Sequence, residues 1–182
     1  PYQDFYHPNV LAGIYKIMHI FNRGITPMQA AGYFPVLAIL FSIIPLFFLI
    51  KALGGGNVGA FFGSIFFAAN GSLIGRTLWG HADTDAYNVF FPLVILALFV
   101  YSYTLKDWKR KFSILIFTGF VTALYSRFWS GWWYIFDFIL ATIGIYLIYL
   151  LIKYKKKFFK SLKTKNTLAT AIPYVIISLL SV

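Results

Sequence analysis

The apolar residues of this 182-residue chain fall in long runs that are separated by short blocks of Lys and Arg. About 20 mostly apolar residues are enough for a helix to cross a bilayer, so each run predicts a transmembrane helix. The predicted spans lie at about 28–50, 58–75, 86–105, 112–126, 132–152 and 167–182. The fourth run is short, and the sixth is still apolar at the last residue. We therefore expect an all-α polytopic membrane protein, preceded over residues 1–27 by a more polar segment with a short helix near 10–21.

The composition excludes several other classes of protein. Hydrophobic residues make up 60% of the chain and charged residues only 12%, whereas a soluble domain spends about a quarter of its residues on charge. Disorder requires low hydrophobicity and is excluded too. The net charge of +11 does not indicate a nucleic-acid partner, because the basic residues stand between apolar runs and not across one solvated face. The absence of Cys excludes disulfides and thiolate metal sites.

The positions of the basic residues predict an orientation in the membrane. Twelve of the sixteen Lys and Arg residues lie at Lys51 and in the loops 106–111 and 153–165, and the alternate loops contain the other four. Cytoplasmic loops carry an excess of Lys and Arg, so these Lys-rich loops should be cytoplasmic and the loop 76–85 external. The chain lacks an initiator Met and ends inside an apolar run. We therefore expect an internal piece of a larger protein.

The loop 76–85 concentrates most of the chemistry that the chain offers. All five acidic residues are Asp, and two of them, Asp83 and Asp85, stand in this loop together with Arg76 and His81. Side chains at i and i+2 of an extended segment lie on the same side, so both carboxylates could reach one ion. Hard divalent cations such as Mg²⁺ and Mn²⁺ take oxygen ligands of this kind. The spacing therefore favours a metal site with Asp83 and Asp85 as ligands.

Other interpretations of the same residues stay open. An Asp-Thr-Asp sequence before a helix is also a good N-cap, and one residue can fill both roles. Arg76 could anchor the chain at the membrane interface, pair with a carboxylate or bind a phosphate. His81 could be a ligand, a phosphate contact or an exposed loop residue. Arg127 could extend to the interface or contact a donor phosphate, and Trp79 is a further candidate for substrate binding.

These motifs resemble the catalytic subunit of oligosaccharyltransferase, the family called Stt3 in eukaryotes, AglB in archaea and PglB in bacteria. The resemblance rests on Arg76-Thr77, Gly80 and Asp83-Thr84-Asp85 before a span that contains Pro92, and on the run Ser130-Gly131-Trp132-Trp133-Tyr134-Ile135-Phe136. The signs of the loops, the short fourth span and the order of the spans match as well. The resemblance covers nearly the whole chain, and the His-Ala-Asp-Thr-Asp sequence with the Lys-rich loops is similar to archaeal members.

The resemblance implies a glycosyltransferase of the GT-C fold class in a prokaryotic cell membrane. Such enzymes transfer an oligosaccharide from a dolichyl phosphate or diphosphate to Asn in an Asn-x-Ser/Thr sequon, with inversion at the sugar carbon and with Mn²⁺ or Mg²⁺. By this resemblance Asp83 is the metal-binding acid of the second motif and Asp85 is its partner. Arg76 then orients the carboxylates or contacts the donor.

The chain also departs from the family pattern. The first acidic motif of the family precedes this chain, and Asp4 does not match it. The Glu of the later external loop is missing, because the chain has no Glu. The soluble C-terminal domain with its Trp-Trp-Asp motif is absent, since Trp132-Trp133 is followed by Tyr134 on a different loop. We therefore expect this piece alone to be inactive.

Two alternatives remain at the level of the sequence. Another polyprenyl-phosphate-sugar transferase of the same fold class would carry its acidic pair in the first external loop. A transporter or structural membrane subunit would show polar residues near the middle of several spans. Here Asp137 alone lies well inside a span. Both alternatives therefore fit this chain less well than the oligosaccharyltransferase family, whose pattern includes the acidic pair in this external loop.

Overall fold

The computed structural model describes residues 6–181, which form helices joined by short connections and contain no strand. This confirms the all-α prediction. The chain divides into two compact units, one of Pro1–Ala97 with Arg127–Ser130 and one of Leu98–Ser126 with Gly131–Val182. Helix α6 (Tyr87–Thr104) contributes residues to both units. Asp4, which the sequence analysis sets aside, lies outside the described residues.

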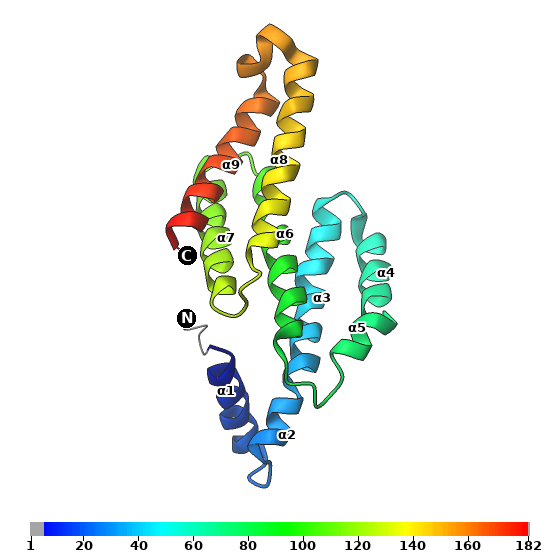
Figure 1. The fold of residues 1–182 in the computed structure, drawn as a ribbon. Coiled ribbons are helices and arrows are strands. Elements are labelled where there is room, and N and C mark those ends of the chain that lie inside the picture. Colours follow the sequence, from blue (N-terminus) through cyan, green and yellow to red (C-terminus); the bar gives the residue numbers. More distant parts are fainter. Residues whose placement is uncertain (1–5, 182) are drawn as a thin grey trace. The chain divides into compact units, whose positions relative to one another are not determined.

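The elements are drawn in Figure 1. The first unit contains α1 (Tyr6–Phe21), α2 (Pro27–Gly32), α3 (Phe34–Ala52), α4 (Gly56–Ala68), α5 (Gly71–Arg76) and the 3₁₀ turn η1 (Thr84–Ala86). The second contains α7 (Trp108–Ser126), α8 (Trp133–Tyr154), the 3₁₀ segment η2 (Lys155–Lys160) and α9 (Leu162–Ser181). The short helix expected near 10–21 begins earlier, at Tyr6.

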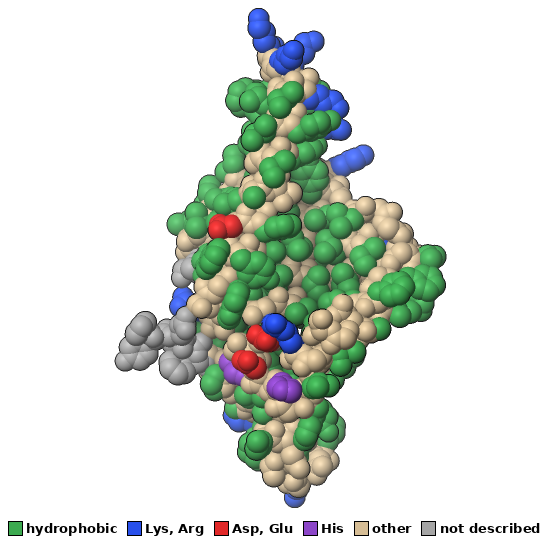
Figure 2. Space-filling view, turned by 45° about the vertical axis from the view of Figure 1, so that its right-hand side comes forward, with side chains coloured by type: hydrophobic (Ala, Val, Ile, Leu, Met, Phe, Trp, Pro, Cys, Tyr) green, Lys and Arg blue, Asp and Glu red, His purple; other side chains and the backbone are tan. Residues whose placement is uncertain are grey.

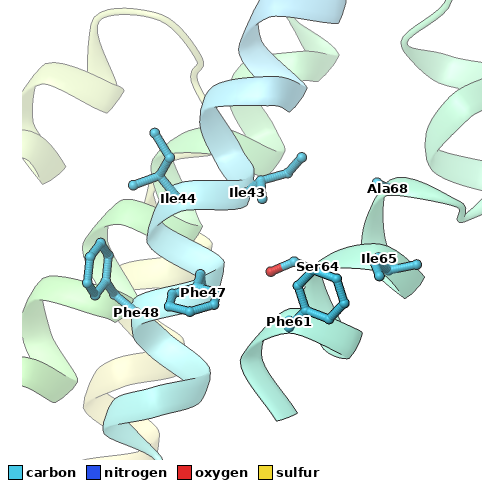
Figure 3. Close-up of a pocket in the computed structure, with 8 residues that line it drawn as sticks. All are labelled: Ile43, Ile44, Phe47, Phe48, Phe61, Ser64, Ile65 and Ala68. Carbon is cyan, nitrogen blue, oxygen red and sulfur yellow. The ribbon is translucent and has the colours of Figure 1, made fainter. Parts of the chain in front are cut away.

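In the first unit α3 and α4 pack against each other through a tight turn. Gly54 and Gly56 adopt positive φ angles of 95° and 64°, a backbone region that glycine enters without steric cost. A Cβ added at Gly63 would lie 2.5 Å from Ile50, so the small residue allows a close approach of the two helices. Figure 3 shows the apolar groove of about 440 Å³ between them, lined from α3 by Ile43, Ile44, Phe47 and Phe48 and from α4 by Phe61, Ser64, Ile65 and Ala68.

The prediction of one continuous helix over 58–75 is wrong. α4 ends at Ala68 and α5 begins at Gly71, because Asn70 is extended (ψ 116°) and its side chain accepts a hydrogen bond of 2.9 Å from the Leu73 amide. Asn at this position is a strong N-cap and starts a new helix. The 13 residues of α4 extend over about 20 Å, which is less than the hydrocarbon core of a bilayer. The break directs α5 into the loop that follows.

In the second unit α7 packs along α9. Thr118, Thr122 and Tyr174 are fully buried at this contact. Lys111, at the start of α7, is 3% exposed and its ammonium donates hydrogen bonds to the side chains of Asn166 and, at 3.5 Å, Thr170. Burial lowers the pKa of the Lys111 ammonium because it disfavours the charged form. Polar groups thus join the first turn of α7 to the second and third turns of α9.

The Lys-rich segment 153–165 joins two helices, as expected for a loop between spans, but most of it is helical. α8 continues to Tyr154, η2 follows directly, and α9 begins at Leu162. The direction changes at Lys155, whose φ of 45° is the one positive value at a non-glycine residue among residues 6–181. Lys153 remains on α8 and donates a hydrogen bond of 3.1 Å to the Tyr149 hydroxyl. α8 thus ends two residues after the expected position 152, whereas α9 begins five residues before the expected position 167.

Three helical stretches among the described residues are long and apolar enough to cross a membrane: Pro27–Ala52, Thr84–Thr104 and Trp133–Lys160. The other segments expected to span are helical but shorter or more polar, so the total of six spans stays a prediction. Figure 2 shows hydrophobic side chains over much of the visible surface. Large apolar residues such as Phe66, Ile145 and Ile152 are exposed. Such surfaces suit a lipid environment.

The close contact of α7 with α9 gives a first test. A Cβ added at Gly119 would lie 2.5 Å from Ile177 and 3.2 Å from the Ser178 amide nitrogen, whereas one added at Gly144 of α8 would meet open space. Gly119→Ala should therefore lower the thermal unfolding midpoint in detergent, because overpacking costs about 1–3 kcal/mol. Gly144→Ala also gains about 1 kcal/mol of helix propensity and should not lower the unfolding midpoint. Equal midpoints for the two variants would contradict this packing.

Candidate functional site

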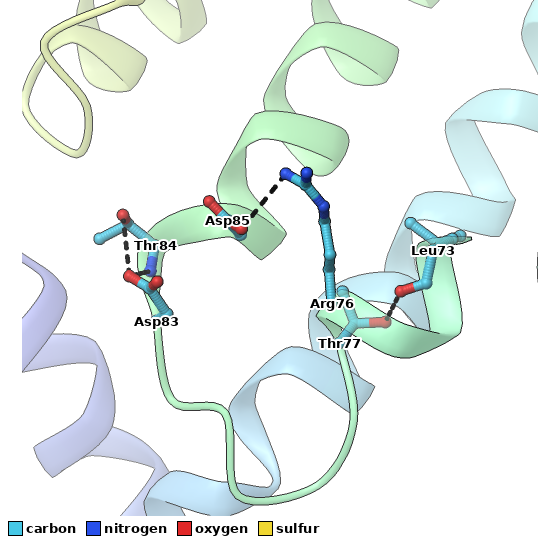
Figure 4. Close-up of polar contacts among 6 residues, drawn as sticks. All are labelled: Leu73, Arg76, Thr77, Asp83, Thr84 and Asp85. Atoms are coloured by element: carbon cyan, nitrogen blue, oxygen red, sulfur yellow. Dashed lines mark hydrogen bonds and ion pairs between the residues drawn. The ribbon is translucent and has the colours of Figure 1, made fainter. Parts of the chain in front are cut away.

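The loop with the acidic pair begins where α5 ends. Thr77 is buried, and its hydroxyl donates a hydrogen bond of 2.7 Å to the Leu73 carbonyl in the last turn of α5. Gly80 has a φ of 98°, which reverses the chain within the loop. The His81 amide then donates to the Leu78 carbonyl at 3.1 Å. The loop lies wholly in the first unit, and Figure 4 shows it between α5 and η1.

Asp83 is the N-cap of η1, as the sequence predicts. Its backbone is extended (φ −101°, ψ 167°) and its Oδ1 accepts hydrogen bonds from the Thr84 amide at 2.6 Å and the Thr84 hydroxyl at 3.3 Å. Its other oxygen, Oδ2, has no hydrogen-bond partner within the described part of the chain. The cap therefore orients the carboxyl group and leaves one oxygen available for a ligand.

Asp85 forms an ion pair with Arg76 across the loop. The Arg76 Nη1 lies 3.8 Å from the Asp85 Oδ2 (Figure 4), which corresponds to one of the three roles left open for Arg76 by its sequence. Both side chains are accessible, with 78% of Arg76 and 42% of Asp85 exposed. Exposed pairs of this kind contribute little to stability, typically about 0–1 kcal/mol. The remaining guanidinium donors of Arg76 are free to bind an anion.

The backbone of the acidic pair differs from the expected extended segment. Asp83 is extended, but Asp85 lies within η1, so the rule for alternate residues of a strand does not apply to both. Figure 4 shows both carboxylates beside Thr84, at the N-terminal end of η1. This end of a helix carries partial positive charge, which attracts anionic groups.

The donor set fits a hard divalent cation. Carboxylate oxygens are the preferred ligands of Mg²⁺, which is commonly bound through one or two carboxylates together with water and phosphate oxygens. Across residues 6–181 there is no group of three or more His, Cys, Asp or Glu side chains that could hold a metal by themselves. Binding of a metal by Asp83 and Asp85 therefore stays a prediction, and it would need further ligands from water or substrate.

Two backbone contacts that the sequence analysis missed fix the loop. The Gly80 amide donates a hydrogen bond of 3.2 Å to the carbonyl of Gly32, the last residue of α2. His7 of α1 lies with Nε2 3.0 Å from the Ala82 carbonyl oxygen and with Nδ1 3.1 Å from the Tyr87 hydroxyl. His7 and Ala82 are 75 residues apart, so no local spacing signals this contact.

The three candidates for substrate binding lie in the same unit as the acidic pair. Trp79 is 57% exposed. Its ring and the ring of Tyr33 are arranged edge to face, with centroids 6.2 Å apart. His81 is exposed on the loop. Arg127 is also exposed, and the next residue, Phe128, packs its ring 4.5 Å from that of Tyr87. The substrate roles of all three stay predictions.

The fold and the loop define a helical membrane protein with an exposed acidic pair next to an arginine. Residues 6–182 match the family model described as oligosaccharyl transferase STT3, N-terminal. The match covers nearly the whole chain. The chain therefore belongs to the STT3 family of oligosaccharyl transferases and is an integral membrane protein.

Two curated proteins show the same relationship. The chain is 28% identical over 160 residues to the dolichyl-phosphooligosaccharide-protein glycotransferase of Methanococcus voltae, covering 86% of this chain and 17% of that protein. It is 25% identical over 120 residues to the protein of the same name from Methanocaldococcus jannaschii, covering 61% of this chain and 13% of that protein. The chain thus spans less than a fifth of the length of these relatives. No solved structure is significantly similar to it.

The contact of Gly32 with the loop gives a second test. A Cβ at Gly32 would lie 3.1 Å from the Trp79 ring and 3.2 Å from the Gly80 nitrogen, so Gly32→Ala should displace the loop. Amide hydrogen exchange over 78–83 should become about tenfold faster, which corresponds to the lower end of overpacking costs. Gly75→Ala, at the end of α5 and facing open space, is the matched control. Equal exchange rates in the two variants would contradict the close approach.

Proposed function

We propose that Arg76, Asp83 and Asp85 form part of the active site of an oligosaccharyltransferase. The enzyme would transfer a glycan from a dolichyl phosphate or diphosphate to the side chain of Asn in an Asn-x-Ser/Thr sequon, with inversion at the sugar carbon. The observation that carries the proposal is the exposed Arg76–Asp85 pair beside Asp83, in a chain of the STT3 family. The names of the two relatives, which specify transfer from a dolichyl-linked oligosaccharide to protein, support it.

The acceptor requires activation that carboxylates can supply. An amide nitrogen is a poor nucleophile because its lone pair is conjugated with the carbonyl group. Asp83 and Asp85 are accessible acceptors that could take hydrogen bonds from the two amide hydrogens and so weaken this conjugation. The cap at Asp83 holds that carboxylate in place by its bond to Thr84, so little reorganisation is needed when the acceptor binds.

Arg76 and a divalent cation account for the donor side of the reaction. The guanidinium of Arg76 can orient Asp85 and still donate to a phosphate oxygen of the donor. Asp83 and Asp85 would hold Mn²⁺ or Mg²⁺. When bound, such a cation supplies positive charge that fixes the carboxylates and favours a leaving phosphate. Trp79, His81 and Arg127 are candidates for further contacts with donor or acceptor.

The proposal includes an orientation. The loop 76–85 would face the exterior, and the basic segments at 106–111 and 153–165 would face the cytoplasm, where anionic lipid attracts them. An external active site allows the acceptor polypeptide to reach the loop after it has crossed the membrane. Because the chain covers less than a fifth of each of its two curated relatives, every test of activity uses the complete enzyme that contains it.

The principal test replaces one charge and keeps the shape. Asp83→Asn in the complete enzyme should lower the rate of glycan transfer to a sequon peptide, with Mn²⁺ present, by about 100-fold, since a preorganised active-site interaction is lost. Asp107→Asn is a matched control, because Asp107 is also exposed and, like Asp83, accepts a backbone hydrogen bond through its Oδ1, from the Lys109 amide at 3.1 Å. A wild-type rate for Asp83→Asn would refute the assignment.

A second comparison separates the geometry of Arg76 from its charge. Arg76→Lys keeps the charge but loses the planar fork that can serve Asp85 and a phosphate together. The transfer rate should fall by about tenfold, the effect of losing about 1.4 kcal/mol of transition-state stabilisation. Arg110→Lys, in the ion pair of Arg110 with Asp107 at 3.5 Å, should leave the rate unchanged. If Arg76→Lys and Arg110→Lys change the transfer rate equally, Arg76 has no specific role.

A further inference from the structure

Both ring nitrogens of His7 are engaged in hydrogen bonds within the first unit. Nε2 lies 3.0 Å from the Ala82 carbonyl oxygen, and Nδ1 lies 3.1 Å from the Tyr87 hydroxyl. A carbonyl oxygen can only accept, so Nε2 carries the hydrogen and donates to Ala82. In the neutral imidazole Nδ1 then accepts from the Tyr87 hydroxyl. The two partners lie on either side of the acidic pair, at the end of the loop and at the start of α6.

Aromatic contacts hold the ring of His7 in this orientation. The His7 ring meets Phe34 at 5.2 Å and Tyr87 at 5.5 Å, in both cases edge to face. Phe34 and Tyr87 are buried and lie 4.7 Å apart, so they form a fixed surface for the imidazole. The position of Nε2 is therefore set by α3 and α6, and not by the loop to which it donates.

The bond to Ala82 acts on the residue that precedes Asp83. The Asp83 amide donates to the His81 carbonyl at 2.7 Å, so the chain from His81 to Asp83 forms a tight turn. The Gly80 amide is bound to Gly32 on the other side of this turn. Gly80 and Ala82 are thus both held by hydrogen bonds to other elements, and Asp83, which follows them, has an extended backbone.

We propose that His7 is a positioning residue for the acidic pair and acts through the Ala82 carbonyl. The anchoring of the loop stands on geometry alone, whereas its consequence for glycan transfer rests on the function proposed above. Since both nitrogens of His7 are in use while the loop is anchored, His7 serves neither as a metal ligand nor as a general base in this state. Its effect on the reaction is exerted through the placement of Asp83.

The two nitrogens can be tested separately by substitution. The amide nitrogen of Gln occupies a position close to Nε2 of His, and that of Asn a position close to Nδ1. His7→Gln can therefore keep the bond to Ala82, whereas His7→Asn cannot reach it. Tyr87→Phe removes the partner of Nδ1 and leaves the bond to Ala82 intact. These three variants distinguish the bond to Ala82 from the bond to Tyr87.

The first measurement is amide hydrogen exchange in the complete protein without added metal or substrate. His7→Asn should accelerate exchange at Asp83 and Thr84 by roughly 10-fold or more, while His7→Gln and Tyr87→Phe should stay within a few fold of wild type. Unchanged exchange in α3 and α4, which belong to the same unit as His7, shows that a variant is folded. If His7→Asn does not fold, slow exchange in His7→Gln still supports the proposal and fast exchange overturns it.

The second measurement is glycan transfer by the complete enzyme with Mn²⁺. His7→Asn should lower kcat by roughly 10- to 100-fold and raise the Mn²⁺ concentration for half-maximal activity, as the loss of a group supporting a metal ligand does. His7→Gln should restore both values, and the KM for the sequon peptide should change little. A change confined to that KM would instead indicate a structural effect on acceptor binding and would overturn the catalytic part.

The outcomes separate this proposal from the proposed function. Exchange that is equal in His7→Asn and His7→Gln, or as fast in Tyr87→Phe as in His7→Asn, overturns the anchoring through Ala82. A wild-type transfer rate for Asp83→Asn refutes the proposed function. It does not affect the anchoring of the loop, which hydrogen exchange tests separately. An inactive Asp83→Asn together with a fully active His7→Asn overturns the positioning role alone.

Discussion

The placement of the acidic loop depends on hydrogen bonds to its backbone and not on its charged side chains. Gly80 is bound to the carbonyl of Gly32, and the Ala82 carbonyl is bound by His7. Because these contacts hold the loop, the carboxylates are not needed for that purpose. The exposed Arg76–Asp85 pair adds little stability. The charged groups are thus oriented and still accessible to a substrate.

Much of this site follows from local sequence patterns. An Asp-Thr-Asp sequence before a helix is a good N-cap, and Asp83 is observed to cap η1. Arg76 and Asp85 flank one loop, and their pairing needs only that the loop turns back on itself, which it does at Gly80. The apolar runs predict helices, since a chain in lipid must satisfy its backbone polar groups internally. The same motif resembles the STT3 family, and the family match agrees.

What the sequence could not predict depends on single side chains or on distant partners. Hydropathy is averaged over a window, so it does not register that one Asn70 caps a new helix within an apolar run. Hydropathy also does not show that most of the Lys-rich segment 153–165 is helical. Lys has good helix propensity, so the chain can be helical on both sides of the change of direction at Lys155. His7 meets Ala82 across 75 residues, a contact that no spacing rule contains.

The central claim is that Asp83 and Asp85 together form a metal-dependent active site, and binding of Mn²⁺ tests it most directly. Electron paramagnetic resonance of the complete protein titrated with Mn²⁺ reports bound ion without requiring activity. The account predicts that the wild type and Asp107→Asn bind Mn²⁺ with equal affinity, and that Asp83→Asn/Asp85→Asn binds it at least about tenfold more weakly. Wild-type affinity in the double variant would contradict the account.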